Sequence, residues 1–171
     1  MERMVLGVQP MSNPRNPHSV LFVCLGNICR SPAAEGILRH QAETEHLEIT
    51  ISSCGLGDWH QGELPDPRMR RVASARGIQL ESHAQSIQKK MFETYDWIFA
   101  ADHAVLRELI TLAETQEQKA KIHLMSAFAN QYKDLEIPDP YSGDESSFEY
   151  VLDMLEECCH GILEQLKEKS S

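Results

Sequence analysis

A short and almost continuously apolar run, SVLFVC at residues 19–24, most constrains the fold of this chain. Such a run is typical of a strand that is covered on both faces, as the strands of parallel sheets are. Apolar residues at helical spacing follow from residue 31 to about residue 45. Pro32 suits the first turn of that helix, where a backbone N–H has no intrahelical partner to lose. A buried strand that leads directly into a helix indicates a βαβ unit.

The same alternation continues along the chain. Further strands are predicted at residues 47–53, 96–101 and 121–125, and further helices at residues 68–76, 86–94 and 103–113. The last helix has the clearest signal, because Ser146 and Glu149 form a capping box ahead of an apolar helical face. The sequence therefore predicts the α/β class, as three α/β/α layers around a four-stranded, mostly parallel sheet.

The length of 171 residues suits one domain, which we expect at residues 19–169. Residues 1–18 contain three prolines and lack the apolar core of a signal peptide, so we expect a disordered N-terminal arm. The apolar runs are too short to cross a membrane. Five cysteines without regular spacing do not describe a disulfide framework, which indicates a reducing, cytoplasmic location.

The net charge of -10 argues against a nucleic-acid-binding protein, which needs a basic surface. Cysteine and histidine spacing does not indicate a metal site. A small anion site is still compatible with this charge, because backbone amides and a single arginine create positive potential locally.

The loop after the first strand has the spacing Cys24-x5-Arg30-Ser31. A loop of this length that opens a helix can turn its N–H groups inward, and the helix N-terminus adds positive potential. Arg30 can close the ring with a planar pair of donors that matches two phosphoryl oxygens. We therefore predict a phosphate-binding loop that consists of Leu25, Gly26, Asn27, Ile28, Cys29, Arg30 and Ser31.

Cys24 is the predicted nucleophile. The field that binds an anion also stabilises a thiolate, which can attack phosphorus and form a phosphocysteine. The Ser31 hydroxyl could donate to the sulfur, Gly26 permits a turn that a Cβ would resist, and Asn27 could lock the loop through its amide. The alternative is that Cys24 is only a small buried residue and that Arg30 forms a surface pair.

Hydrolysis of a phosphate monoester also needs a proton donor for the departing oxygen. Asp139 lies between Pro138 and Pro140, and such a stiff loop suits an accurately positioned group. An ordinary Asp-Pro turn is the alternative reading of Asp139. Asp66 is a rival with the same neighbours, but it directly precedes a predicted helix and better suits an N-cap.

Two motifs, VCLGNICRSP at residues 23–32 and IPDPY at residues 137–141, resemble those of the low-molecular-weight protein tyrosine phosphatases. The resemblance covers nearly everything from residue 19 to the C-terminus. It implies a four-stranded parallel sheet flanked by helices, with no metal and no organic cofactor. By this similarity Cys24 is the nucleophile, Arg30 binds the transition-state phosphoryl group, and Asp139 is the general acid and then the general base.

The resemblance also implies supporting residues. Ser31 would hydrogen-bond the thiolate, and Asn27 would hold the loop with Ser53 as its partner. His83 resembles the family's buried structural histidine, with the local spacing shifted by one residue. Cys29 matches a second loop cysteine, which could form a reversible disulfide with the nucleophile or could simply fit there as a small residue.

Substrate access is expected between Trp59 and Tyr141. Trp59 falls in a loop where related enzymes often carry an aromatic residue against the phosphotyrosine ring, although a surface-packing tryptophan is the alternative. The family often has two aromatic residues after Asp-Pro, but here Tyr141 is followed by Ser142. This departure removes one aromatic contact.

The resemblance implies hydrolysis of phosphotyrosine in proteins or peptides, and of small aryl phosphates, through a phosphocysteine intermediate. Phosphate and other oxyanions are the expected ligands, and the expected state is a monomer or weak homo-oligomer. Arsenate reduction is one alternative, but it needs cysteines that relay a disulfide, and residues 55–157 contain none. A non-catalytic phosphotyrosine-binding module is another alternative, which the presence of both Cys24 and Asp139 disfavours.

Overall fold

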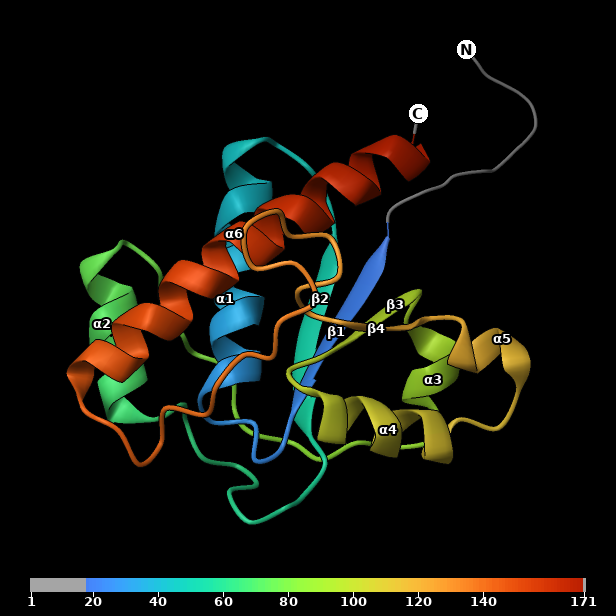
Figure 1. The fold of residues 1–171 in the computed structure, drawn as a ribbon, viewed down its shortest axis with the longest axis horizontal. Coiled ribbons are helices and arrows are strands. Elements are labelled where there is room, and N and C mark those ends of the chain that lie inside the picture. The colour runs from blue at the N-terminus through green and yellow to red at the C-terminus, as the bar shows by residue number, and fades with distance from the viewer. Residues whose placement is uncertain (1–17, 171) are drawn as a thin grey trace.

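The computed structural model describes residues 18–170 of the chain (Figure 1). Its strands are β1 (Ser19–Cys24), β2 (Thr50–Gly55), β3 (Trp97–Ala100) and β4 (Ile122–Leu124). Its helices are α1 (Arg30–Thr44), α2 (Pro67–Ala75), α3 (Met91–Thr94), α4 (His103–Leu112), α5 (Gln116–Lys119) and α6 (Glu145–Ser170). The disorder predicted for residues 1–18 concerns a segment that, apart from His18, lies outside the described residues.

The four strands form one sheet in the order β2-β1-β3-β4, and all neighbouring strands are parallel. This confirms the predicted α/β class with a four-stranded parallel sheet. Val23 near the end of β1 lies opposite Ala100 at the end of β3. The loops that follow these two strands therefore meet at the carboxyl edge of the sheet, where parallel α/β sheets bind ligands.

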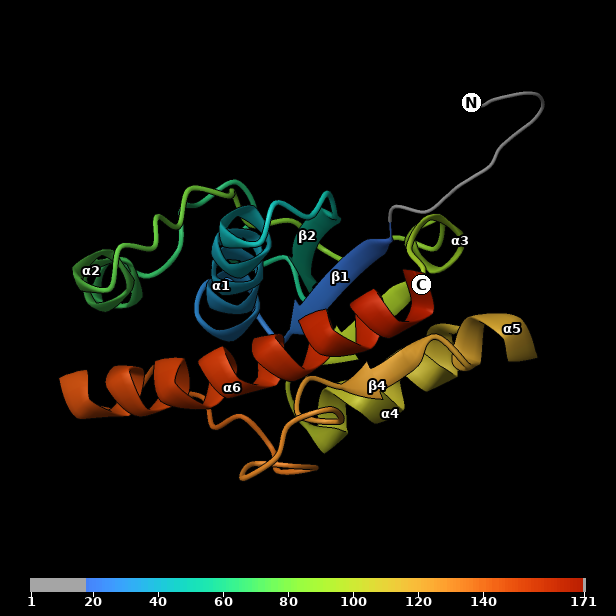
Figure 2. The same cartoon turned by 90° about the horizontal axis from the view of Figure 1, so that it is seen from above.

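Helices cover both faces of the sheet (Figures 1 and 2). Helices α1 and α6 pack together on one face with α2 beside them, whereas α3 and α4 cover the other face. The side chains of β1 alternate between these layers. Val20 and Phe22 join the apolar core under α1 and α6, and Leu21 and Val23 join the core under α3 and α4. This alternation explains why the run at residues 19–24 is apolar throughout.

Two predicted elements are displaced or shortened. The second strand begins at Thr50, later than predicted, because the chain is still leaving α1 at His46, which has a φ of 57°. The helix predicted at residues 86–94 is reduced to α3. Its first part instead pairs with β2, since the N–H of Ile87 donates to the carbonyl of Gly55 at 2.8 Å.

The capping box predicted for the last helix is wrong. Helix α6 begins at Glu145, so Ser146 lies within its first turn. Asp144 accepts hydrogen bonds from the Oγ of Ser146 at 2.6 Å and from the N–H of Ser147 at 3.3 Å. The short helix α5 was not predicted either, because it lacks an apolar period. Within residues 18–170, no helix combines the length and apolar character that crossing a bilayer requires.

Candidate functional site

The loop between β1 and α1 turns its carbonyl groups away from its centre. The carbonyls of Cys24, Leu25 and Ile28 each accept a backbone hydrogen bond from the segment 56–66, at 2.8–3.0 Å. Because a trans peptide group points its N–H opposite to its carbonyl, the N–H groups that follow them face the inside of the loop. Gly55 permits this close packing, since a Cβ there would lie 2.9 Å from the carbonyl oxygen of Leu25. The loop is therefore a cradle of inward-facing amides.

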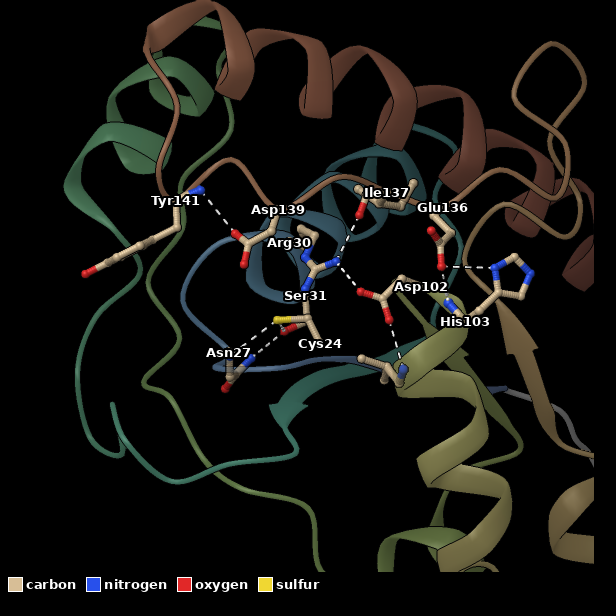
Figure 3. A network of polar contacts seen from close by, with 11 residues as sticks. Cys24, Asn27, Arg30, Ser31, Asp102, His103, Glu136, Ile137, Asp139 and Tyr141 are labelled. Atoms are coloured by element: carbon tan, nitrogen blue, oxygen red, sulfur yellow. Dashed lines mark hydrogen bonds and ion pairs between the residues drawn. The ribbon is translucent and has the colours of Figure 1, made fainter.

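Cys24 lies at the base of this cradle (Figure 3). Its Sγ accepts the N–H of Asn27 at 3.3 Å and lies 3.0 Å from the Oγ of Ser31. The residue is only 3% exposed, yet it lines a cavity of about 200 Å³. The sulfur therefore lies within hydrogen-bonding distance of a loop amide and of a hydroxyl at the base of the cavity.

Asn27 sets the direction of the hydrogen bonds around the sulfur. Its Oδ1 accepts the N–H of Gln85 at 2.9 Å, so its Nδ2 donates to Ser31 at 2.7 Å and to Ser53 at 3.0 Å. Ser53 donates in turn to the Oε1 of Glu35 at 2.6 Å. Ser31 accepts from Asn27, so its own hydroxyl proton is free to be donated. The sulfur of Cys24, at 3.0 Å, is a nearer acceptor for that proton than the carbonyl of Cys54, at 3.4 Å. The expected contact between Asn27 and Ser53 is present.

Arg30 is 4% exposed and lines the same cavity as Cys24. Its Nη1 donates to the Oδ2 of Asp102 at 2.8 Å and to the carbonyl of Ile137 at 2.9 Å (Figure 3). Burial raises the pKa of Asp102, but hydrogen bonds from the N–H of Val105 and from Arg30 outweigh it, so this pKa lies below its ordinary value. These two bonds orient the guanidinium through Nη1. Its Nη2 and Nε have no hydrogen-bond partner within residues 18–170, so they can bind an anion.

Asp139 lines the same cavity as the sulfur. Its Oδ1 accepts the N–H of Tyr141 at 3.1 Å, and the side chain is otherwise exposed (Figure 3). The rival Asp66 accepts the N–H of Arg68 at 2.8 Å and caps α2. The predicted N-cap role of Asp66 is therefore confirmed, and Asp139 is the member of the pair that reaches the cavity.

Aromatic side chains form the mouth of the cavity. Trp59 is 65% exposed and Tyr141 is 50% exposed, and both line the opening. His60 lines it as well and was not predicted. Its Nδ1 lies 3.0 Å from the Oε1 of Glu63, and its ring covers Gly26, where a Cβ would approach to 3.2 Å. The mouth therefore offers flat surfaces to a planar ring.

His83 was expected to be buried beside the Asn27 network, and this expectation is wrong. The side chain is exposed, and the backbone N–H of Gln85 takes the contact with Asn27 instead. Cys29, in contrast, does line the cavity, and burial raises the pKa of its thiol. Both Cys24 and Cys29 are free thiols.

Sequence reasoning missed two acidic residues behind the loop. Asp102 follows β3, and the available signal was an acidic residue directly after a predicted strand, at the edge where parallel sheets bind ligands. Glu35 is buried on α1, where Arg39 donates to its Oε2 at 2.8 Å. A glutamate on the apolar face of a predicted helix was the available signal. No group of three or more histidine, cysteine or acidic side chains within residues 18–170 could hold a metal ion.

The chain matches known proteins over most of its length. Residues 19–171 match the family model described as Low molecular weight phosphotyrosine protein phosphatase. The Low molecular weight protein-tyrosine-phosphatase of Streptomyces coelicolor is 38% identical over 156 residues, covering 89% of this chain and 95% of that protein. The Low molecular weight phosphotyrosine protein phosphatase of Sus scrofa is 39% identical over 152 residues, covering 87% and 96%.

A solved structure shares the fold. The protein tyrosine phosphatase from Entamoeba histolytica with Hepes in the active site superposes with a TM-score of 0.86 at 38% identity. The alignment covers 91% of this chain and 100% of that one. The similarity therefore extends over nearly the whole fold rather than over one motif.

Proposed function

Because the chain belongs to the low molecular weight phosphotyrosine protein phosphatase family and is a protein tyrosine phosphatase, we propose that it hydrolyses phosphotyrosine and small aryl phosphates through a phosphocysteine intermediate. The observation that carries this proposal is that Cys24, Arg30 and Asp139 line one cavity. A nucleophile, an anion ligand and a proton donor are the groups that the reaction needs.

In the first step the Cys24 thiolate attacks phosphorus while the bond from phosphorus to the phenolic oxygen breaks. The loop amides and Arg30 stabilise the charge on the other phosphoryl oxygens. Asp139 gives its proton to the departing oxygen, and Oδ2 is its donor atom because Oδ1 accepts the N–H of Tyr141. The products are the free phenol and an S-phosphorylated cysteine.

In the second step water attacks the phosphocysteine. The Asp139 carboxylate takes a proton from the water, phosphate forms, and the sulfur departs as a thiolate. The Ser31 hydroxyl, 3.0 Å from that sulfur, donates to it and makes it a better leaving group. The Asn27 network supports this step because it keeps the Ser31 proton directed at the sulfur.

The mouth of the cavity supports phosphotyrosine as the substrate. Trp59 and Tyr141 present aromatic surfaces to the phenyl ring. Phosphotyrosine is long enough to bring phosphorus to the base of the cradle, whereas phosphoserine is short. The relative with Hepes in its active site supports an oxyanion site, since Hepes carries a sulfonate.

We further propose that residues 19–169 act as one catalytic domain, as a monomer or weak homo-oligomer, in the cytoplasm. The cysteines Cys24, Cys29, Cys54, Cys158 and Cys159 are all free thiols. Free thiols support a reducing compartment.

The test of the function compares the wild-type protein with Cys24→Ser. We expect the wild type to hydrolyse p-nitrophenyl phosphate and phosphotyrosine peptides, with inhibition by vanadate. The Cys24→Ser variant should lose nearly all turnover but still bind inorganic phosphate, because the amide cradle and Arg30 are unchanged. Full turnover by Cys24→Ser would contradict the covalent route.

A further inference from the structure

The position of Asp139 depends on the loop that carries it. The side chain is exposed, and the hydrogen bond it makes, with the N–H of Tyr141, stays within that loop. A proton donor on an exposed loop is placed accurately only if the backbone on both sides of it is fixed. The contacts of that backbone therefore decide where the acid lies.

On the N-terminal side of Asp139 the backbone is fixed by buried contacts. Ile137 donates its N–H to the carbonyl of Ala101 at 2.9 Å and accepts from Arg30 at 2.9 Å. Ile137 is fully buried. These bonds fix the chain two residues before Asp139 and do not reach the residues after it.

On the C-terminal side the anchor is Arg68, from α2. Its Nη2 donates to the carbonyl of Tyr141 at 2.9 Å. Its guanidinium also lies over two rings, 5.4 Å from the centroid of Tyr141 and 4.7 Å from that of Phe148. The carbonyl of Tyr141 is thus bonded to Arg68, and its N–H is bonded to Asp139.

Arg68 is itself fixed to the phosphate-binding loop through Asp66. The Oδ1 of Asp66 accepts from the Nε of Arg68 at 3.1 Å, and its Oδ2 accepts from Nη2 at 2.9 Å. The Asp66 side chain is only 5% exposed, and a buried carboxylate holds its cation because an unpaired buried charge is costly. The backbone N–H of Asp66 donates to the carbonyl of Ile28, inside the phosphate-binding loop, at 2.8 Å.

We propose that Arg68 is a positioning residue that holds Asp139 in place relative to the phosphate-binding loop. The connection runs from Ile28 through Asp66 to Arg68, and then through the carbonyl and the N–H of Tyr141 to the carboxyl group of Asp139. Arg68 does not line the cavity, so it acts through Asp139 and not on the phosphate. The inference rests on the proposed function, in which Asp139 is the proton donor.

The experiment measures kcat/KM on two substrates that differ in their need for a proton donor. Phenyl phosphate has a poor leaving group, whereas 2,4-dinitrophenyl phosphate has a good one. Loss of the bond from Arg68 in Arg68→Gln should lower kcat/KM for phenyl phosphate roughly three- to tenfold. The value for 2,4-dinitrophenyl phosphate should fall less than about twofold, because its leaving group departs without a proton.

Two further variants separate positioning from folding. Arg68→Lys keeps a cation for Asp66 but lacks the planar guanidinium that bonds Asp66 through Nε and Nη2 while Nη2 also reaches the Tyr141 carbonyl. It should therefore fold, as thermal unfolding would report, and show the same selective loss. The matched control is Arg71→Gln, on the same helix, whose Nη2 reaches Glu145 on α6 at 3.3 Å. This control should leave kcat/KM for both substrates unchanged.

The decisive comparison adds Arg68→Gln to Asp139→Asn. If Arg68 acts through Asp139, the second substitution should bring no further loss on phenyl phosphate. Equal losses on both substrates, or a loss that persists without the Asp139 carboxyl, would overturn the inference. If Asp139→Asn itself shows no selective loss on phenyl phosphate, the acid of the proposed function fails and the role of Arg68 fails with it. A selective loss in Asp139→Asn but not in the Arg68 variants overturns the role of Arg68 alone.

Discussion

The Asn27 network should contribute a large part of the stability of the loop that carries the nucleophile. Asn27 is 3% exposed and has a φ of 61°, in the left-handed region. Its side chain makes hydrogen bonds with Gln85, Ser31 and Ser53. The substitution Asn27→Ala removes all of these bonds. It also places at a positive φ a residue whose side chain has no hydrogen bonds to offset the steric cost of that conformation.

The expected loss follows from these contacts. The three side-chain hydrogen bonds of Asn27 contribute about 1 kcal/mol each, which gives about 3 kcal/mol. An alanine in the left-handed region costs about 1 kcal/mol more. We therefore expect Asn27→Ala to lower the free energy of unfolding by about 4 kcal/mol, and Asn27→Gly by about 3 kcal/mol, since glycine adopts this φ without steric cost.

Urea unfolding followed by tryptophan fluorescence measures both values. Asp134→Ala is the matched control, because Asp134 also has a positive φ, 62°, but its side chain is exposed. This control isolates the conformational cost, which should be about 1 kcal/mol. The reasoning is refuted if Asn27→Ala costs no more than Asp134→Ala, or if Asn27→Gly is less stable than Asn27→Ala.

Three further predictions concern pH, thiol reactivity and substrate binding. The pKa of Asp102 is lower in the folded than in the unfolded chain, so its stabilising effect is present above a pH of about 4 and is lost as the pH falls further. Urea unfolding between about pH 6 and about pH 3 should therefore show a smaller pH-dependent loss in Asp102→Asn than in the wild type, and an equal loss would count against this effect. Iodoacetamide at neutral pH should label Cys24 alone in the folded protein, because burial raises the pKa of Cys158 to about 12 and also raises the pKa of Cys29, Cys54 and Cys159. Labelling of a second thiol at a similar rate would contradict this prediction. Trp59→Ala should raise KM for phosphotyrosine peptides roughly three- to tenfold, because it removes a contact with the phenyl ring of the substrate, while inhibition by inorganic phosphate stays unchanged. Weaker inhibition by phosphate would contradict a role of Trp59 at the substrate ring.

The loop with the nucleophile could be predicted because its chemistry is local. Residues 24–31 lie between a buried strand and a helix start, and both of these are readable from nearby side chains. The same is true of Asp66, whose place before a helix indicated its capping role. The roles of Asp139 and Trp59 came from the family resemblance, because an Asp-Pro turn and an exposed tryptophan are common without function.

The supporting contacts could not be predicted because they join distant segments. The bond between Arg30 and Asp102 depends on the order of strands in the sheet. Asp102 reaches the loop after β1 because β3, the strand that it follows, lies beside β1. Gln85 replaces His83 beside Asn27 because its segment pairs with the edge of β2, and the pattern of residues 82–88 does not reveal this pairing. Such contacts depend on tertiary packing, which overrides local propensity.

The covalent intermediate is the central claim of this account. Its most direct test uses Asp139→Ala with 2,4-dinitrophenyl phosphate. The good leaving group lets the first step proceed without the acid, whereas the second step lacks its base, so the phosphoenzyme should accumulate. Rapid denaturation followed by mass spectrometry should then find the phosphoryl group on the peptide that contains Cys24. A phosphoryl group on another residue, or continued turnover without any phosphoenzyme, would contradict the account.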